Sequence, residues 1–445
     1  MFKTLRNAWA LEDLRKKMIY TMMILLIYRI INAIPVPFVD THLMKDWFSS
    51  NMNSTILGLY NAMSGFGMER ASVLALGIQP YINSSIIIQL LCVAIPALER
   101  MSKEQGEVGK KKIEKITRIT TVAIGLLLGF AYYTMLKNGN ASILVEGGND
   151  WKGAVVIIGT FTAGSCLVMW LGEQINAKGI GNGISMILFA NILSGFPSMV
   201  TTAINGLDPQ KGVPVQTPTG VEAAFFKWWE LLIIAVLLIL VTLFIVYVND
   251  AERRIPIQYA KRVVGRKVYG GQSTNLPIKV SMSGVMPVIF ASSIIAVPAT
   301  FCTFLGKTGP NNWWYWNVFH QSSWIYVIVY TLLIFFFSWF YSTIQYDPVE
   351  ISNNLQKNGG FIPGFRSGKP TAQFIKKVIS KILVFGAVYL SIVALLPMIG
   401  NIFIKASQGL AIGGTSVIIV VGVALETVKA LEAQMMMRHY KGFLD

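Results

Sequence analysis

The sequence is poor in charged residues, in cysteine and in histidine. Of its 445 residues 13% are charged, 53% are hydrophobic, and the mean hydropathy is +0.55. This composition excludes a soluble globular domain. The three cysteines, Cys92, Cys166 and Cys302, lie within apolar stretches and lack metal-ligand spacing. We therefore expect neither a disulfide framework nor a zinc site.

Motifs of enzyme chemistry are also missing from the sequence. There is no His-Glu-x-x-His motif and no nucleophile elbow. The glycine-rich run at 179–183 follows an apolar stretch rather than a strand, and residues 106–112 lack the spacing of a nucleotide-binding loop. We predict that the chain is not an enzyme and needs no cofactor, so that a partner must supply any energy for transport.

Long apolar stretches dominate what is present. Each is long enough for a helix that crosses a hydrocarbon core of about 30 Å. There are ten, near 18–34, 73–98, 119–136, 153–172, 184–203, 228–248, 281–302, 323–345, 378–398 and 410–428. The sequence therefore predicts an all-α polytopic membrane protein with ten transmembrane helices.

Basic residues alternate between the loops and predict the orientation. Of the 38 lysines and arginines, 29 lie in the N-terminus, the tail and every second loop, whereas the opposite loops hold eight. Basic loops stay in the cytoplasm, so we expect both termini there. The net charge of +16 would then face anionic lipids, acidic proteins or RNA at the membrane.

The stretches divide into two sets of five, at 1–203 and 228–428. A proline-containing external segment, 204–227, separates them, and a cytoplasmic tail follows at 429–445. Halves with an odd number of spans have opposite orientations. If they share a fold they form an inverted repeat around a central path near the bilayer midplane.

One external segment and two cytoplasmic loops differ from ordinary connectors. Residues 54–68 are moderately apolar but too short to span, so they lie on the outer surface or fold back into a cavity. Residues 249–280 predict a cation-rich hairpin, and residues 346–377 contain a Gly/Pro-rich turn that holds an arginine at its tip. These loops serve either orientation alone or docking of a partner.

Charges within the spans are scarce. Arg29 lies toward the outer end of the first span, where it can snorkel, and Glu173 and Glu426 lie near cytoplasmic ends. Ion-coupled carriers typically place carboxylates in mid-membrane, so this pattern weakens the alternative of a five-plus-five solute carrier without removing it. A path lined by aliphatic side chains, which closes by dewetting, is a second kind of pore.

Several stretches resemble the bacterial SecY family, the main subunit of the protein-translocation channel. They cover nearly the whole chain in the order of the predicted spans. The matching runs are Ala-Leu-Gly-Ile-Gln-Pro-Tyr-Ile (75–82), Trp-Leu-Gly-Glu-Gln-Ile (170–175), Lys-Gly-Ile-Gly-Asn-Gly-Ile-Ser (178–185), Ser-Thr-Asn-Leu-Pro-Ile-Lys-Val (273–280), Met-Pro-Val-Ile-Phe-Ala-Ser-Ser (286–293) and Phe-Ile-Pro-Gly-Phe-Arg (361–366).

The resemblance implies four groups of functional residues. The pore ring would consist of Ile78, Ile82, Ile184, Leu188, Ile289 and Ile419. The plug, near 54–68, would include Leu57, Gly58, Tyr60, Met63 and Gly65. Polar residues at a lateral gate would be Ser84, Ser85, Gln89, Ser292 and Ser293. Contacts with a motor or ribosome would be Arg253, Arg254, Lys261, Arg262 and Arg366.

The resemblance also implies a function and partners. The chain would form a passive channel that passes unfolded secretory polypeptides across the bacterial plasma membrane and releases apolar segments sideways into lipid. Its partners would be the small membrane subunits SecE and SecG, the motor ATPase SecA, the ribosome, signal sequences and anionic lipids. A membrane scaffold without transport is a third alternative.

Overall fold

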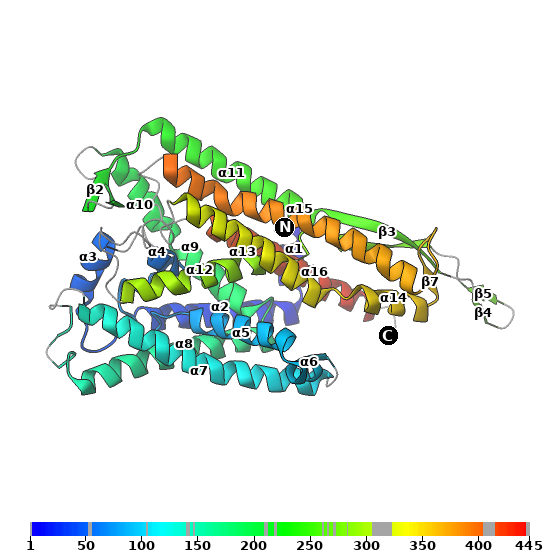
Figure 1. The fold of residues 1–445 in the computed structure, drawn as a ribbon, viewed down its shortest axis with the longest axis horizontal. Coiled ribbons are helices and arrows are strands. Elements are labelled where there is room, and N and C mark those ends of the chain that lie inside the picture. Colours follow the sequence, from blue (N-terminus) through cyan, green and yellow to red (C-terminus); the bar gives the residue numbers. More distant parts are fainter. Residues whose placement is uncertain are drawn as a thin grey trace.

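The structure, a computed structural model, is built mainly of long helices that run along one direction (Figure 1). It describes residues 2–51, 56–103, 106–138, 143–145, 147–208, 212–217, 220–259, 262–264, 267–269, 273–282, 284–304, 323–403 and 414–441. The helices are α1 (Phe2–Ala10), α2 (Glu12–Asn32), α3 (Thr41–Asn51), α4 (Ile56–Met63), α5 (Gln79–Ala94), α6 (Pro96–Lys103), α7 (Gly106–Asn138), α8 (Trp151–Lys178), α9 (Gly183–Ser194), α10 (Phe196–Leu207), α11 (Trp228–Asp250), α12 (Met286–Phe304), α13 (Trp324–Gln345), α14 (Pro348–Lys357), α15 (Lys369–Phe403) and α16 (Gly414–Lys441).

Each predicted apolar stretch coincides over most of its described residues with a helix. Among the described residues, six helical segments are long and apolar enough to cross a membrane: Gly106–Lys137, Trp151–Lys178, Gly183–Leu207, Trp228–Asp250, Trp324–Lys357 and Lys369–Leu396. The other four stretches lie on α2, α5, α12 and α16. The outward faces of the helices carry apolar side chains, as on α11, where Leu240 and Leu243 are exposed. Such faces suit contact with lipid, so the protein is membrane-embedded.

Two predicted helix boundaries differ from those in the structure. The second stretch, predicted to begin at residue 73, is turn structure as far as Ile78, and α5 begins at Gln79. Gly77 has a φ of 53°, a left-handed conformation that interrupts a helix. The fifth stretch is divided at Gly195 into α9 and α10, because Pro197 removes a backbone donor at that point.

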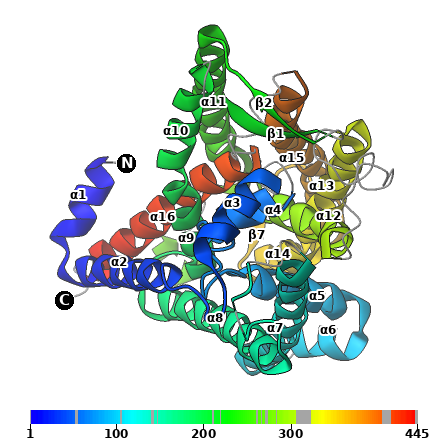
Figure 2. The same cartoon turned by 90° about the vertical axis from the view of Figure 1, so that its left-hand side faces the viewer.

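The two halves contact each other along two seams. α5 and α7 pack on α12 at one seam, and α9 packs on α16 at the other. Viewed along the helices, α4 lies between helices of both halves (Figure 2). The largest apolar cluster is made of side chains from both halves, so the core of the protein is at their interface.

The predicted cation-rich hairpin is present and has its own small core. β3 (Glu252–Tyr259) pairs antiparallel with β6 (Ser273–Lys279), and β7 (Gly360–Phe361) adds to the other edge of β3. Ile255 and Ile257 of β3 turn inward and pack with residues of α14 and α15. We call this unit, β3, β6, β7, α14 and the first turns of α15, the platform. Two further pairs of short strands are antiparallel: β1 (Val213–Thr217) with β2 (Gly220–Ala224), and β4 (Arg262–Val264) with β5 (Lys267–Tyr269).

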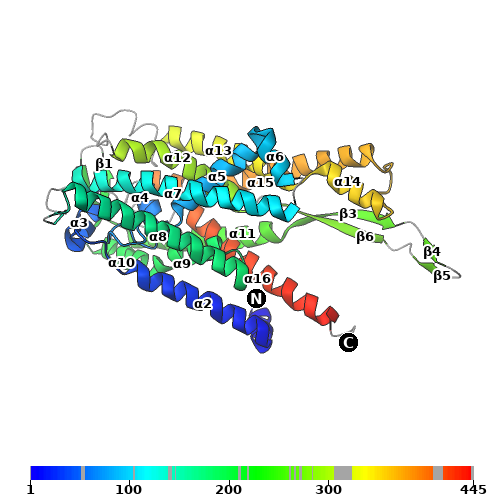
Figure 3. The same ribbon diagram turned by 90° about the horizontal axis from the view of Figure 1, so that it is seen from below.

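The platform and the chain ends lie toward one end of the helices. α3 and the β1–β2 hairpin lie at the opposite end (Figures 1 and 3). α1 packs on α16, where the Thr4 hydroxyl donates to Glu432 at 3.0 Å, so the N-terminus is held near the C-terminal helix. The chain ends and the platform thus share one end of the molecule, and the prediction that this end faces the cytoplasm stays a prediction.

We predict that Ile257→Ala loosens the platform while the membrane helices stay folded. Ile257 is 3% exposed, and truncation of a buried isoleucine typically costs about 2–5 kcal/mol of unfolding free energy. Limited trypsin digestion in detergent should then cut the β3–β6 hairpin faster than in the wild type. Gln258→Ala, an exposed neighbour, is the control and should leave the cleavage rate unchanged. Equal rates for both variants would contradict an independent platform core.

Candidate functional site: an aliphatic ring beside a buried short helix

The six predicted ring residues gather at the interface of the two halves. Ile78 and Ile82 lie at the start of α5, Ile184 and Leu188 on α9, Ile289 on α12 and Ile419 on α16. All except Ile184 are at most 5% exposed and belong to the central apolar cluster, and Ile184 packs against it. The i, i+4 spacing on α5 and α9 puts both members of each pair on one helix face. The structure thus brings the six residues together, and their role as a pore ring stays a prediction.

Of the short segment 54–68, the described part, residues 56–68, lies inside the protein. α4 packs against α9 and α12, and Gly58, Met63 and Gly65 are buried. Met63 belongs to the same apolar cluster as the ring, and Tyr60 packs against both of the larger clusters. The side chain of Leu57 lies outside the described part of the chain. The sequence left open whether this segment lies on the outer surface or folds back into the protein. In the structure its described residues fold back into the protein.

α4 ends in a Schellman motif. The backbone N–H of Phe66 donates to the carbonyl of Asn61 at 2.8 Å, and that of Gly65 donates to Ala62 at 3.1 Å. This motif needs a left-handed residue, and Gly65 has a φ of 70°. The motif pairs two of the carbonyls that every helix leaves free at its C-terminal end.

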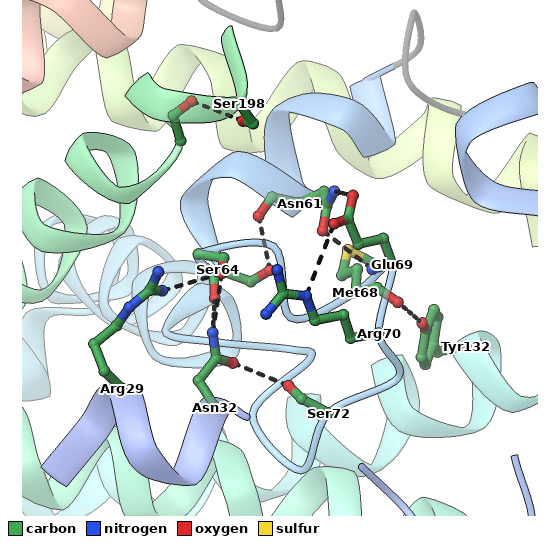
Figure 4. A network of polar contacts seen from close by, with 12 residues as sticks. Arg29, Asn32, Asn61, Ser64, Met68, Glu69, Arg70, Ser72, Tyr132 and Ser198 are labelled. Atoms are coloured by element: carbon green, nitrogen blue, oxygen red, sulfur yellow. Dashed lines mark hydrogen bonds and ion pairs between the residues drawn. The ribbon is translucent and has the colours of Figure 1, made fainter. Parts of the chain in front are cut away.

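Side chains from α2 and α9 pair the next three carbonyls, and Figure 4 shows Arg29 and Asn32, the two from α2 that reach the carbonyls of Ser64 and Gly65. Asn191 Nδ2 of α9 donates to the carbonyl of Met63 at 2.8 Å. Asn32 Nδ2 of α2 donates to the carbonyls of Ser64 and Gly65 at 3.2 and 3.0 Å, and Arg29 Nη1 donates to Gly65 at 3.1 Å. The Tyr28 hydroxyl donates to Ser64 at 3.3 Å and accepts from Asn191 at 2.8 Å. We call Tyr28, Arg29, Asn32 and Asn191 the anchor.

The chain that follows α4 is irregular, and side-chain hydrogen bonds hold it in place. Asn61 Nδ2 donates to the Glu69 carboxylate at 3.1 Å, and the Tyr132 hydroxyl donates to the carbonyl of Met68. Ser72 Oγ donates to Asn32 Oδ1 at 2.9 Å. Burial raises the pKa of the Glu69 carboxyl, and the hydrogen bond from Asn61 and the nearby Arg70 oppose that shift. These contacts fix the position at which α4 leaves the loop.

Sequence reasoning did not find the anchor and assigned no partner to Arg29. We expected that Arg29 can snorkel at the outer end of its span; in the structure the residue is exposed and its guanidinium donates to the carbonyl of Gly65. The free carbonyls at the end of a short helix are what attract it, because cations favour the negative end of a helix. An arginine and an asparagine three residues apart on one span are the signal that the sequence offered.

The five predicted gate residues divide between different contacts. Ser84 Oγ donates to the carbonyl of Thr117 on α7 at 2.8 Å, so this serine joins α5 to a helix of its own half. Gln89 donates to Ser85 within α5 at 3.2 Å, and Ser292 donates to the carbonyl of Ile289 within α12. Ser293 is buried on α12 without a hydrogen-bond partner among the described residues. A gate role for these residues remains a prediction.

The predicted partner-contacting cations lie on or near the platform. Arg253 and Arg254 are exposed on β3, where Arg254 also contacts Glu252 at 2.7 Å. Arg366 is exposed at the turn after β7, and the Thr371 hydroxyl binds its carbonyl at 2.9 Å. β7 pairs with β3, so this turn and the hairpin form one surface. Lys261 and the side chain of Arg262 lie outside the described residues.

Comparison with known proteins shows which family the chain belongs to. A family model described as SecY matches residues 72–428. The protein translocase subunit SecY of Streptomyces galbus is 41% identical over 453 residues, with 100% of both chains covered. That of Thermotoga maritima is 39% identical over 450 residues and covers 100% of this chain and 98% of the relative.

Solved structures agree on the fold. A structure described as a protein-conducting channel matches with a TM-score of 0.62 and 17% identity, over 95% of this chain and 92% of the other. Sec61 in a canine ribosome–channel complex matches with a TM-score of 0.57 and 16% identity, over the same shares. The predicted all-α polytopic fold is confirmed.

We predict that Gly65→Ala destabilises the protein. A Cβ there would lie 2.6 Å from both Arg29 Nη1 and Asn191 Oδ1, and the left-handed conformation alone costs a non-glycine residue about 1–2 kcal/mol. Thermal unfolding in detergent should show a lower midpoint. The matched control is Gly159→Ala in α8, where a Cβ meets nothing within 4 Å, and which should be neutral or stabilising. A Gly65→Ala variant as stable as the wild type would be inconsistent with the observed end of α4.

Proposed function

Because the chain belongs to the SecY family, we propose that it is the protein-conducting subunit of a translocation channel. It passes unfolded secretory polypeptides across a membrane and releases apolar segments sideways into lipid. The observation that carries this proposal is the aliphatic ring at the interface of the two halves, with a short buried helix packed beside it.

The ring acts as a seal and as a passage. Apolar side chains at a constriction exclude ions because water leaves a narrow apolar space. Leu188 and the five isoleucines offer few directional bonds, so an extended chain of any sequence can pass between them. α4 is the plug that fills the space beside the ring at rest, a role supported by the packing of Met63 against the same cluster.

Entry of a substrate begins at the lateral seam. A signal sequence is an apolar helix that binds where α5 and α7 meet α12 and α13, and it gains about 25 cal/mol for each Å2 of apolar surface removed from water. Its binding favours the open state and so shifts a closed–open equilibrium. Ser84, Ser85, Gln89, Ser292 and Ser293 are the polar residues near this seam.

The cytoplasmic side binds the partners. The platform, with Arg253, Arg254 and Arg366 exposed, suits the phosphates of ribosomal RNA or the acidic surface of a motor ATPase, since guanidinium groups bind both in forked pairs. Lys261 and Arg262 belong to the same loop. We propose SecA and the ribosome as these partners, SecE and SecG as membrane subunits, and anionic lipids around the basic loops. The membrane is the plasma membrane, with both termini in the cytoplasm.

The rival function is a five-plus-five solute carrier. Glu173 lies near the C-terminal end of α8, and Glu426 lies beside Lys279, at the base of the platform. These features favour the channel. Reconstituted vesicles distinguish the two functions: a carrier takes up a small solute in a saturable manner alone, whereas the channel needs a motor, ATP and a presequence-bearing substrate. Solute uptake without those additions would contradict the proposal.

We predict that Ile82→Asn or Ile289→Asn weakens the seal. Each puts an amide into the apolar cluster, which hydrates the constriction and makes opening easier. Ion conductance of the resting complex in a planar bilayer should rise, and precursors with defective signals should be exported. Ile87→Asn, on the exposed face of α5, is the control. Unchanged leakage and unchanged signal selectivity would count against the ring.

We predict that Arg366→Glu impairs motor-driven export more than it affects abundance. Arg366 is exposed, so its reversal removes a partner contact at little cost in folding. ATP-dependent export of a precursor into vesicles should fall severalfold, with the amount of channel and its membrane insertion near wild type. Lys152→Glu, an exposed lysine on the other side, is the charge-matched control. An equal fall in abundance and in export would indicate a folding role instead.

A further inference from the structure

We propose that Asn191 couples dilation of the ring to release of α4, so that the seal and the plug open as one event. This inference rests on the proposed channel function. It concerns the anchor, which holds the last turn of α4 by side chains of α2 and α9. Of the two helices, α9 also carries two ring residues, and this shared position is what makes the coupling possible.

Met63 is the point where the ring and the plug meet. Its carbonyl accepts from Asn191 at 2.8 Å, and its sulfur accepts from Gln79 Nε2 at 3.3 Å. Asn191 lies three residues after Leu188 on α9, and Gln79 follows Ile78 at the start of α5. Two of the helices that carry the ring therefore hold the same residue of α4. Outward movement of α9 with Leu188 withdraws the amide from Met63.

The chain packs closely around Asn191. A Cβ on Gly65 would lie 2.6 Å from Asn191 Oδ1, and one on Gly195 would lie 2.5 Å from the ring of Phe66. Asn191 is fully buried and also donates to the Tyr28 hydroxyl, which in turn donates to Ser64. A shift of α9 thus disturbs the bonds to two successive carbonyls at the end of α4.

The α2 side of the anchor has a different role. Arg29 and Asn32 bind Ser64 and Gly65 but belong to a helix with no ring residue. They hold α4 closed without sensing the ring. The two sides of the anchor thus differ in role. Asn32 stabilises the closed position of α4, whereas Asn191 both stabilises that position and couples it to the ring.

The test uses the complete channel complex in vesicles and in planar bilayers. A cysteine at Ala62, which is buried, reports plug release by its labelling rate with a membrane-impermeant thiol reagent, after Cys92, Cys166 and Cys302 are replaced by alanine. Resting ion conductance reports the ring. Asn191→Leu should raise the labelling rate on the order of tenfold, because it removes two buried donors. Asn205→Leu, an exposed position on α10, should leave it unchanged.

Combination with a ring variant separates coupling from stability. Ile289→Asn alone should raise both conductance and labelling. With Asn191→Leu present, Ile289→Asn should still raise conductance but should raise labelling by a clearly smaller factor, because only the contact of Gln79 with Met63 then joins a ring helix to α4. With Asn32→Leu present, it should raise both, by the same factors as in the wild type. If Asn191→Leu does not accumulate, Asn191→Ala, which makes no steric demand, gives the same comparison.

Each result is decisive for a different claim. If Ile289→Asn raises labelling by the same factor with and without Asn191, or if Asn191→Leu behaves as Asn205→Leu does, the coupling is overturned while the channel stands. If the unmodified complex exports no precursor when motor and ATP are supplied, the proposed function fails first, and that measurement does not involve Asn191.

Discussion

Pairing of every backbone polar group at membrane depth is the constraint on which the rest of the structure depends. An irregular chain can lie inside a membrane protein where other protein groups replace water as its partners. In residues 64–78, the Schellman motif, the anchor and the bond from Tyr132 to Met68 supply such partners for several backbone groups. These partners come from α2, α7 and α9, so they fix the end of α4 to the N-terminal half, while α4 also packs on α12 of the C-terminal half. The position of α4 therefore depends on the need to supply hydrogen-bond partners for the backbone that follows it.

Two kinds of interaction lie side by side at the centre of the molecule. The contacts between the ring residues are apolar and non-directional. The ring residues can therefore separate and come together again without having to restore a particular geometry. The anchor is directional and short-ranged, so it is either made or lost. An apolar ring alone would seal weakly against a deformable guest, and an anchor alone would not exclude ions. Met63 contacts both the apolar cluster of the ring and Asn191 of the anchor. In the proposed channel, this residue therefore links a non-directional seal to a directional hydrogen bond.

Sequence reasoning predicted the parts of this structure that depend on composition and periodicity. The apolar stretches indicated the helices, and the strand-like alternation in 249–280 indicated the hairpin. The inward positions of Ile255 and Ile257 were not predicted. The ring residues came from family resemblance and lie together in the structure. Contacts between side chains and distant carbonyls were beyond reach, as Arg29 with Gly65 illustrates, because its partner is 36 residues away. Ser84, expected near the gate, binds α7 for the same reason: periodicity gives a face and not a partner.

The platform has a path to the ring through the C-terminal half. β3 begins two residues after α11 ends, and the turn after β7 leads directly into α15. Lys429 of α16 contacts Asp250 at 2.7 Å and the carbonyl of Asn249 at 3.3 Å, where α11 meets the hairpin. α16 carries Ile419 ten residues earlier in the chain. A partner that displaces the hairpin therefore acts on α11, α15 and α16 together, whereas the N-terminal half, with the α2 side of the anchor, is not joined to the platform by any of these links. Force applied to the platform would move one half against the other, and the ring lies where the two halves meet.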